Sequence, residues 1–162
     1  MSKVENIEAK ENKILQLVTF RIGKEEFGFN IFQIKEINKM MDITQIPNSQ
    51  SSVKGVVNLR GSVIPVISLR EKLGFSEVEY NNSTRIIVVE YKTKSIGFIV
   101  DEVSEVLRID SSIIEKPPEM TTSVESTYIN GVAKLENRLL ILLDLDKILT
   151  TNEERELEEI EA

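Results

Sequence analysis

The chain contains no cysteine and no histidine among its 162 residues. Without cysteine it can form no disulfide, no thiolate nucleophile and no zinc–cysteine site. Without histidine it lacks the usual general base near neutral pH, so a Ser-His-Asp or Cys-His arrangement cannot be built. A metal ion could be held only by oxygen ligands. We therefore expect a protein that is not an enzyme, with no catalytic residue, no metal site and no cofactor.

The sequence also lacks a long apolar run. No stretch of it approaches the roughly 20 apolar residues that a membrane-spanning helix needs. The first residues include Lys3, Glu5, Glu8 and Lys10, whereas a signal peptide begins basic and continues apolar. We expect a cytoplasmic protein with no direct insertion into a membrane.

Positive charge is scarce and scattered. The formal net charge is −7, and residues 151–162, with six Glu and one Arg, contribute −5 of it, which leaves −2 for residues 1–150. The Lys and Arg residues form no basic run, and aromatic residues make up only 6% of the chain. The sequence therefore gives no sign of the basic, aromatic face by which some small barrels bind oligonucleotides. We expect no nucleic-acid partner, although a small-barrel nucleic-acid-binding protein is the alternative function to test.

Residues 55–74 carry the clearest structural pattern in the chain. Two short runs of mostly β-branched residues lie on either side of Arg60-Gly61-Ser62, and such runs suit strands packed on at least one face. The glycine supplies the positive φ that a tight hairpin needs. The residues that follow, up to Gly74, predict one helical turn with a glycine stop. The stretch is therefore predicted to be a β-hairpin followed by a short helix.

This pattern occurs twice. A shift of 76 positions superimposes residues 55–74 on residues 131–150, and a shift of 69 superimposes residues 18–37 on residues 87–106. The matched residues include Gly55 with Gly131, Leu69 with Leu145, Gly28 with Gly97, and Glu36 with Glu105. Both pairs follow the same order, so we expect two tandem copies of an all-β unit of about 65 residues. The alternative is that any two hairpins look alike.

A unit of that size is marginal on its own, so two small barrels packed against each other would supply the missing burial. We expect residues 1–13 to form a disordered arm, residues 14–80 the first β-barrel subdomain and residues 81–150 the second. Residues 151–162 are expected to form an acidic C-terminal helix or tail, because glutamate is favoured in a first helical turn.

Two segments do not alternate as a simple strand does. Ile31, Ile34 and Ile37 recur at every third position, which predicts a helical turn that runs into a strand. Residues 39–46 predict a further short strand, ended by Pro47.

The predicted strand over residues 39–46 contains Met40 and Met41 side by side. Successive side chains of a strand point to opposite faces, so one methionine is expected to leave the core. An exposed, adaptable methionine is suited to docking a partner. The alternative is that the acidic C-terminal segment covers it.

Six apolar residues related by the shift of 69 are predicted to lie near the junction of the two copies. They are Ile31, Ile34, Ile37, Val100, Val103 and Val106. A concave apolar seam there would accept a helix. The alternative is that all six belong to the core.

Acidic residues could also be grouped into candidate sites for acid–base catalysis or magnesium. The groups are Asp101-Glu102 with Asp110, and Asp144 with Asp146. With 27 acidic residues in the chain and no spacing that matches an EF-hand loop, turn and solvent positions are the favoured interpretation.

Four motifs resemble those of a known family. They are residues 55–61 (GVVNLRG), 63–70 (VIPVISLR), 97–101 (GFIVD) and 140–144 (LILLD). Together they resemble the CheW family of bacterial chemotaxis coupling proteins, over about residues 15–150. The resemblance implies two tandem five-stranded SH3/OB-like barrels packed about a pseudo-twofold, with short helical turns and no catalysis. It also allows strands to be exchanged between the two barrels.

The resemblance also implies partners and sites. It implies a cytoplasmic adapter, monomeric alone, that joins the regulatory domain of the histidine kinase CheA to the tip of a methyl-accepting chemoreceptor in arrays at the inner face of the membrane. The receptor helix would lie in a seam of Val18, Ile31, Ile34, Val100 and Val103, with Glu36 and Arg60 as a coupling polar pair. The kinase-binding edge would be Lys39, Met40, Met41, Asp42 and Ile43.

Overall fold

The computed structural model describes residues 13–47, 52–116 and 128–149. The expected disordered arm, except Lys13, and the expected acidic C-terminal helix lie outside these residues. The strands are β1 (Ile14–Ile22), β2 (Glu25–Asn30), β3 (Ile34–Lys39), β4 (Val53–Leu59), β5 (Ser62–Ser68), β6 (Arg85–Tyr91), β7 (Lys94–Val100), β8 (Glu102–Asp110), β9 (Ile114–Glu115), β10 (Ile129–Lys134) and β11 (Leu139–Leu143). The helices are the 3-10 turns η1 (Ile31–Gln33) and η2 (Ser111–Ile113) and the single-turn helices α2 (Leu69–Lys72) and α3 (Leu145–Ile148).

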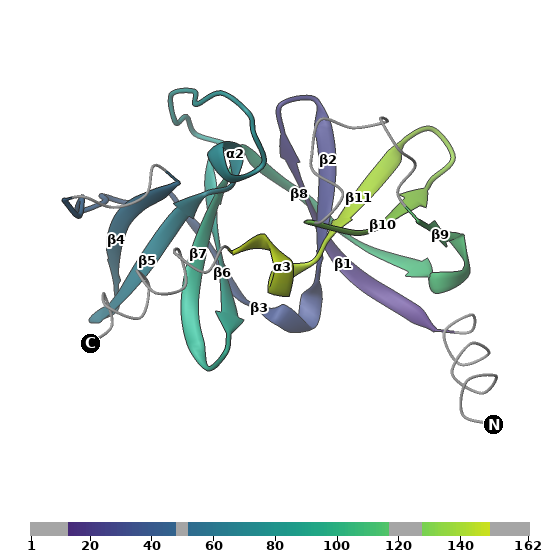
Figure 1. The fold of residues 1–162 in the computed structure, drawn as a ribbon, viewed down its shortest axis with the longest axis horizontal. Helices are drawn as coiled ribbons and strands as arrows, with labels where there is room; N and C mark the ends of the chain where they lie inside the picture. Colours follow the sequence, from purple (N-terminus) through teal and green to yellow (C-terminus); the bar gives the residue numbers. More distant parts are fainter. Residues whose placement is uncertain (1–12, 48–51, 117–127, 150–162) are drawn as a thin grey trace.

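The strands form two mixed sheets that lie side by side, with α3 between them (Figure 1). The six-stranded sheet has the order β8-β1-β2-β11-β10-β9, and the five-stranded sheet has the order β3-β6-β7-β5-β4. Each sheet contains one parallel pair, β2 with β11 and β5 with β7. The expectation of an all-β chain is confirmed at this level, but the sheets have six and five strands because the two-residue strand β9 joins the first.

Both sheets contain strands from both copies of the repeat. The β1–β2 hairpin of the first copy pairs with β8 and β11 of the second. The β6–β7 hairpin of the second copy pairs with β3 and β5 of the first. Each copy therefore supplies part of both sheets.

The pairing registers repeat along with the sequence. In the six-stranded sheet Gly28 faces Leu142, and in the five-stranded sheet Gly97 faces Val66. The register shifts also occur at matching places, between Thr19 and Phe20 in one sheet and between Ile34 and Glu36 in the other. The shifts of 69 and 76 positions therefore relate equivalent positions of the two sheets.

The chain that leaves one edge of each sheet reaches the opposite edge. In the five-stranded sheet, residues after β3 bring Thr44 to Val56 of β4, with backbone hydrogen bonds of 2.8 and 2.9 Å. In the six-stranded sheet, β8 continues through η2 into β9, which pairs with β10. Gly55 permits the first approach, because a Cβ at this φ of +144° would stand 2.1 Å from the Thr44 carbonyl oxygen.

Three apolar clusters hold the sheets. The central cluster joins both sheets and includes Phe20, Phe29, Val89, Phe98 and Leu143. A smaller cluster belongs to each sheet, around Val57, Val66 and Val88 in the five-stranded sheet and around Leu17, Ala133 and Leu140 in the six-stranded sheet. Strands such as β6 (RIIVVEY) are buried on both faces, which explains their continuous apolar runs.

The prediction of a strand over residues 39–46 is wrong. Strand β3 ends at Lys39, and between there and Pro47 the structure has only the Thr44–Val56 bridge. The strand geometry that would send one of the two methionines out of the core is therefore absent. Met40 and Met41 are both half-buried against the cluster of the five-stranded sheet, so neither leaves the core.

The other expected turns are confirmed. The hairpin of residues 55–74 turns at Arg60 and Gly61, whose φ values of 52° and 89° suit a two-residue turn. Asn58 supports this turn, since its Oδ1 accepts a hydrogen bond of 2.8 Å from the Gly61 amide. The helical turn that runs into a strand is η1 followed by β3.

Candidate functional site

The expected seam combines buried and half-buried side chains. Val18 and Val100 are only 3% and 1% exposed, so in this conformation they present no side-chain surface to a partner. Ile31, Ile34 and Val103 are half-buried. Ile34 and Val103 pack against the central cluster from β3 and β8, one in each sheet. The accessible part of this seam therefore comes from three of the five residues.

Phe32 is an exposed aromatic residue beside the seam. It lies in η1, the link between the two sheets, and its side chain is 84% exposed. Asn30 fixes η1, because its Oδ1 accepts a hydrogen bond of 2.9 Å from the Phe32 amide. The three-residue spacing of Ile31, Ile34 and Ile37 left Phe32 off the expected apolar face, which is why the sequence did not single it out.

A pocket of about 290 Å³ adjoins Phe32. Its walls come from β1, β2, β11 and the start of α3, and include Leu15, Leu17, Asn30 and Leu142. The lining is mixed, because the amides of Asn30, Gln33 and Asn130 and the carboxylate of Asp144 lie among the leucines, and a mixed hollow of this kind suits an amphipathic segment.

The Arg60–Glu36 pair is present in the structure. Arg60 Nη2 lies 2.5 Å from Glu36 Oε2, and the two side chains are 69% and 28% exposed. The hydrogen bond from Arg60 lowers the pKa of the Glu36 carboxyl below its ordinary value of 4.5, against the opposing effect of partial desolvation. The same bond raises the pKa of Arg60. The pair links the β4–β5 turn to β3.

A second charge network occupies the equivalent place in the six-stranded sheet. Arg138 Nε lies 3.1 Å from Glu26 and its Nη2 lies 2.9 Å from Glu105. Glu26 is 6% exposed, so Arg138 neutralises a buried carboxylate. The match of Glu105 with Glu36 was the available signal, but Arg138 falls on Ser62 under the shift of 76, so the sequence did not reveal it.

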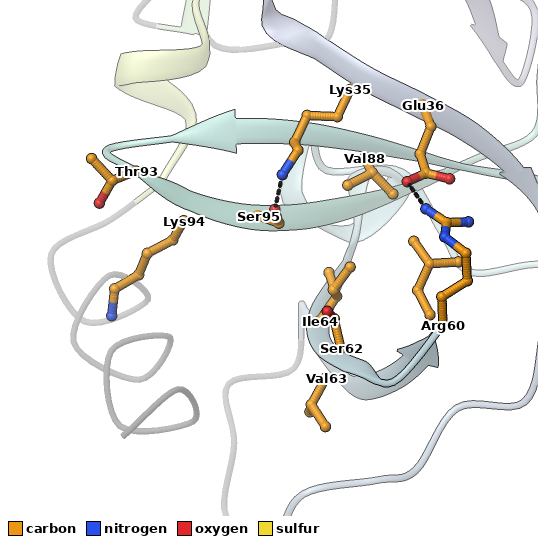
Figure 2. A pocket seen from close by; sticks show the side chains of 11 residues that line it. Lys35, Glu36, Arg60, Ser62, Val63, Ile64, Val88, Thr93, Lys94 and Ser95 are labelled. Atoms are coloured by element: carbon orange, nitrogen blue, oxygen red, sulfur yellow. Dashed lines mark hydrogen bonds and ion pairs between the residues drawn. The ribbon is translucent and has the colours of Figure 1, made fainter.

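A pocket of about 330 Å³ opens at the Arg60–Glu36 pair (Figure 2). Its three cationic residues come from separate elements, Lys35 from β3, Arg60 from the β4–β5 turn and Lys94 from β7. Glu36 is the one carboxylate among the eleven residues that line it. Lys35 Nζ donates a hydrogen bond of 2.8 Å to Ser95 Oγ. We call this feature the cationic pocket.

Arg70 and Asp101 form a further link that the sequence did not reveal. Arg70 Nε and Nη2 each donate a hydrogen bond of 2.9 Å to Asp101, one to each carboxylate oxygen. Asp101 Oδ2 also accepts a bond of 2.8 Å from the Gly23 amide. Asp101 therefore joins α2 to the β1–β2 turn.

The expected kinase-binding edge divides into two kinds of residue. Lys39 and Asp42 are exposed, whereas Met40, Met41 and Ile43 are half-buried against the cluster of the five-stranded sheet. The polar residues are therefore the part of this segment that a partner reaches without a change in packing.

The described part of the chain contains neither a cluster of metal-binding side chains nor a helix that could span a membrane. Residues 13–47, 52–116 and 128–149 contain no group of three or more acidic residues arranged to hold a metal ion. Within those ranges no helix has both the length and the apolar character needed to cross a membrane.

The chain was compared with known proteins. The family model described as CheW-like domain matches residues 16–153. Among curated proteins, the chemotaxis protein CheW of Klebsiella aerogenes is 36% identical over 138 residues, covering 85% of this chain and 83% of the relative. CheW of Helicobacter pylori is 38% identical over 137 residues, covering 85% and 82%. Among solved structures, the scaffolding protein TtCheW of Thermoanaerobacter tengcongensis is similar with a TM-score of 0.79 and 34% identity, covering 86% of this chain and 90% of that one.

Proposed function

Since the chain belongs to the CheW-like domain family, we propose that it is a non-enzymatic chemotaxis adapter, which couples the histidine kinase CheA to the cytoplasmic tip of methyl-accepting chemoreceptors. The observation that carries this proposal is the extent of the match, which includes every described strand from β2 to β11 and most of β1. Its place would be the cytoplasm, in receptor arrays at the inner face of the membrane.

The receptor helix is proposed to bind in the seam. The half-buried residues Ile31, Ile34 and Val103 supply an apolar strip on both sheets, and Phe32 extends it towards the pocket beside η1. Buried Val18 and Val100 would support the strip from below. An amphipathic helix laid across such a strip buries apolar surface on both partners.

The regulatory domain of CheA is proposed to bind the segment from Lys39 to Ile43. Its exposed residues Lys39 and Asp42 would make the direct contacts. Because Met40, Met41 and Ile43 support the cluster beneath, Met41→Asp would test packing as well as binding. Lys39→Glu with Asp42→Lys tests binding alone, since exposed charges of this kind contribute little to stability.

At the level of fold, we propose that each closed sheet is an SH3/OB-like barrel and that the two are related by a pseudo-twofold. The matching registers and the matching edge closures support this proposal. Strands would then be exchanged between the subdomains of residues 14–80 and 81–150.

The function is tested by two binding assays on one set of variants. The purified chain is expected to bind both a receptor cytoplasmic fragment and the CheA regulatory domain. The Lys39→Glu/Asp42→Lys variant should lose kinase binding and keep receptor binding, and Phe32→Ser should do the reverse. The control Lys24→Glu, in the exposed β1–β2 turn, should keep both. Binding to neither partner, together with a salt-dependent oligonucleotide shift, would favour the nucleic-acid alternative.

A further inference from the structure

We propose that the acidic C-terminal segment, residues 151–162, binds in cis to the cationic pocket of the five-stranded sheet and covers the Arg60–Glu36 pair. The inference does not depend on the adapter function. It rests on the charge of the pocket, on the place where the described chain ends, and on a comparison with the six-stranded sheet.

The pocket carries an excess of positive charge. Lys35, Arg60 and Lys94 line it with a single carboxylate, and Arg60 already neutralises that carboxylate. Lys35 Nζ donates its hydrogen bond to the Ser95 hydroxyl, which brings no charge, and Glu36 is the one carboxylate of the lining that both Lys35 and Arg60 share. Hydroxyls of Ser62, Thr93 and Ser95 complete the lining. Ammonium groups and hydroxyls gathered in a hollow are the donors that a carboxylate accepts from.

The equivalent place in the six-stranded sheet is already occupied. There Arg138 is held between Glu26 and Glu105. The two shifts map these three residues onto Ser62, Ser95 and Glu36, so the five-stranded sheet has neither the filling guanidinium nor the buried carboxylate. What remains at this position is an open hollow lined by cations, and an anionic group would be stabilised there by their charge.

The C-terminal segment follows residues that pack in the central cluster, as do the residues on either side of the β6–β7 turn. Ile148 and Leu149 belong to the same apolar cluster as Tyr91 and Ile96, which flank the β6–β7 turn. Thr93 in that turn and Lys94 at the start of β7 both belong to the pocket lining. The thirteen residues after Leu149 span at most about 45 Å when extended.

The segment also has the composition that the pocket requires. It contains six Glu and one Arg, a net charge of −5 out of −7 for the whole chain. Because the ligand is tethered, its local concentration is high even if each contact is weak. Contacts between exposed charges are screened by salt, so the bound state should weaken steeply with ionic strength.

The test uses the absence of native cysteine. Ala162→Cys introduces a unique thiol for a nitroxide spin label in the otherwise unchanged chain. In low salt, the amides of Lys35, Gly61, Thr93, Lys94 and Ser95 are expected to lose at least half of their NMR intensity. The Lys35→Glu/Lys94→Glu variant should restore it, and so should about 1 M salt, where the Debye length is about 3 Å.

The matched control is Lys24→Glu/Lys134→Glu, which makes the same charge change away from the pocket and should leave the broadening intact. Amide dispersion checks that each variant is folded. Broadening centred on Met40 to Ile43, or broadening that survives the pocket reversal, would overturn the proposal. So would the absence of broadening, including the case in which titrated inorganic phosphate shifts the pocket amides and so reveals an anion site for another ligand.

Discussion

The two sheets of this protein share their registers but differ at the place where each one closes. In the six-stranded sheet, Arg138 fills the space between Glu26 and Glu105. In the five-stranded sheet, the equivalent space is the cationic pocket, and Arg60 meets Glu36 at its rim. A repeated backbone therefore carries a filled, structural arrangement in one sheet and an open, accessible one in the other.

The closing segments differ in the same sense. Strand β9 closes the six-stranded sheet by pairing two residues with β10, whereas one bridge at Thr44 closes the five-stranded sheet. A Cβ added at Gly55 would meet the backbone of Thr44, whereas a Cβ added at Gly131 would meet mainly the Ile114 side chain. The five-stranded sheet thus depends more on a single glycine.

Gly55→Ala is expected to have the largest effect on stability. A Cβ there would stand 2.1 Å from the Thr44 carbonyl oxygen at a φ of +144°, which costs about 2 to 6 kcal/mol of unfolding free energy. Gly131→Ala should cost about 1 to 3 kcal/mol, because the Ile114 side chain can shift. Chemical denaturation of both variants measures the difference. Equal losses of unfolding free energy in the two variants would show that the two closures do not differ in this way. Gly61→Ala, which should cost about 1 to 2 kcal/mol, is the control for the effect of positive φ alone.

Arg138→Ala is expected to have the next largest effect on stability. It leaves Glu26, which is 6% exposed, without its guanidinium, and an unsatisfied buried polar group costs about 1 to 3 kcal/mol. Arg60→Ala should leave the thermal midpoint almost unchanged, because its partner is accessible to water. Adding Glu26→Gln to Arg138→Ala should recover part of the loss. If Arg60→Ala destabilised the chain as much as Arg138→Ala, the accessible pair would be structural.

Transplanting the filled arrangement sharpens the comparison. Ser62→Arg with Ser95→Glu places in the five-stranded sheet the two residue types that the six-stranded sheet has at the matching positions. The expected change in stability is only about 0 to 1 kcal/mol, because the new pair lies near solvent. The pocket should close, which abolishes the spin-label broadening from the C-terminal segment. Ser62→Lys with Ser95→Gln is a control that adds bulk without the guanidinium–carboxylate pair.

The smallest effect concerns pH. The folded pKa of Glu36 lies below 4.5, so its contribution is fully present above the unfolded value and is lost as the pH falls through the folded pKa. The difference in thermal midpoint between the native chain and Glu36→Gln should therefore be constant above about pH 5 and vanish in acid. A difference that persisted in acid would have a cause other than this carboxylate.

Much of the secondary structure could be predicted because both faces of the strands are buried and the turns are local. The two mostly β-branched runs of residues 55–74 predicted the strands β4 and β5, and Gly61 marks the hairpin between them. The 3-10 turn at Ile31 followed from the three-residue spacing. These features depend on neighbours in sequence.

Features that depend on distant partners could not be predicted. The segment after Lys39 has the composition of a strand, but its one pairing is the bridge from Thr44 to Val56 of β4, at the opposite edge of the sheet. Arg138 pairs with Glu26 and Glu105 across large separations, and nothing local marks it. At the seam, apolar spacing could not separate buried Val18 and Val100 from half-buried Ile34, since burial depends on how the two sheets pack.

The parallel pairing of β2 with β11 constrains how the chain folds during synthesis. Gly28 of β2 pairs with Leu142 of β11, so the six-stranded sheet cannot be completed until Leu142 has been translated. At roughly 5 to 20 residues per second, that delay is on the order of 6 to 23 seconds, during which β2 has an unpaired edge. Because each sheet takes strands from both copies of the repeat, neither copy can complete a sheet alone, and the six-stranded sheet can be completed only after β11 has been synthesised.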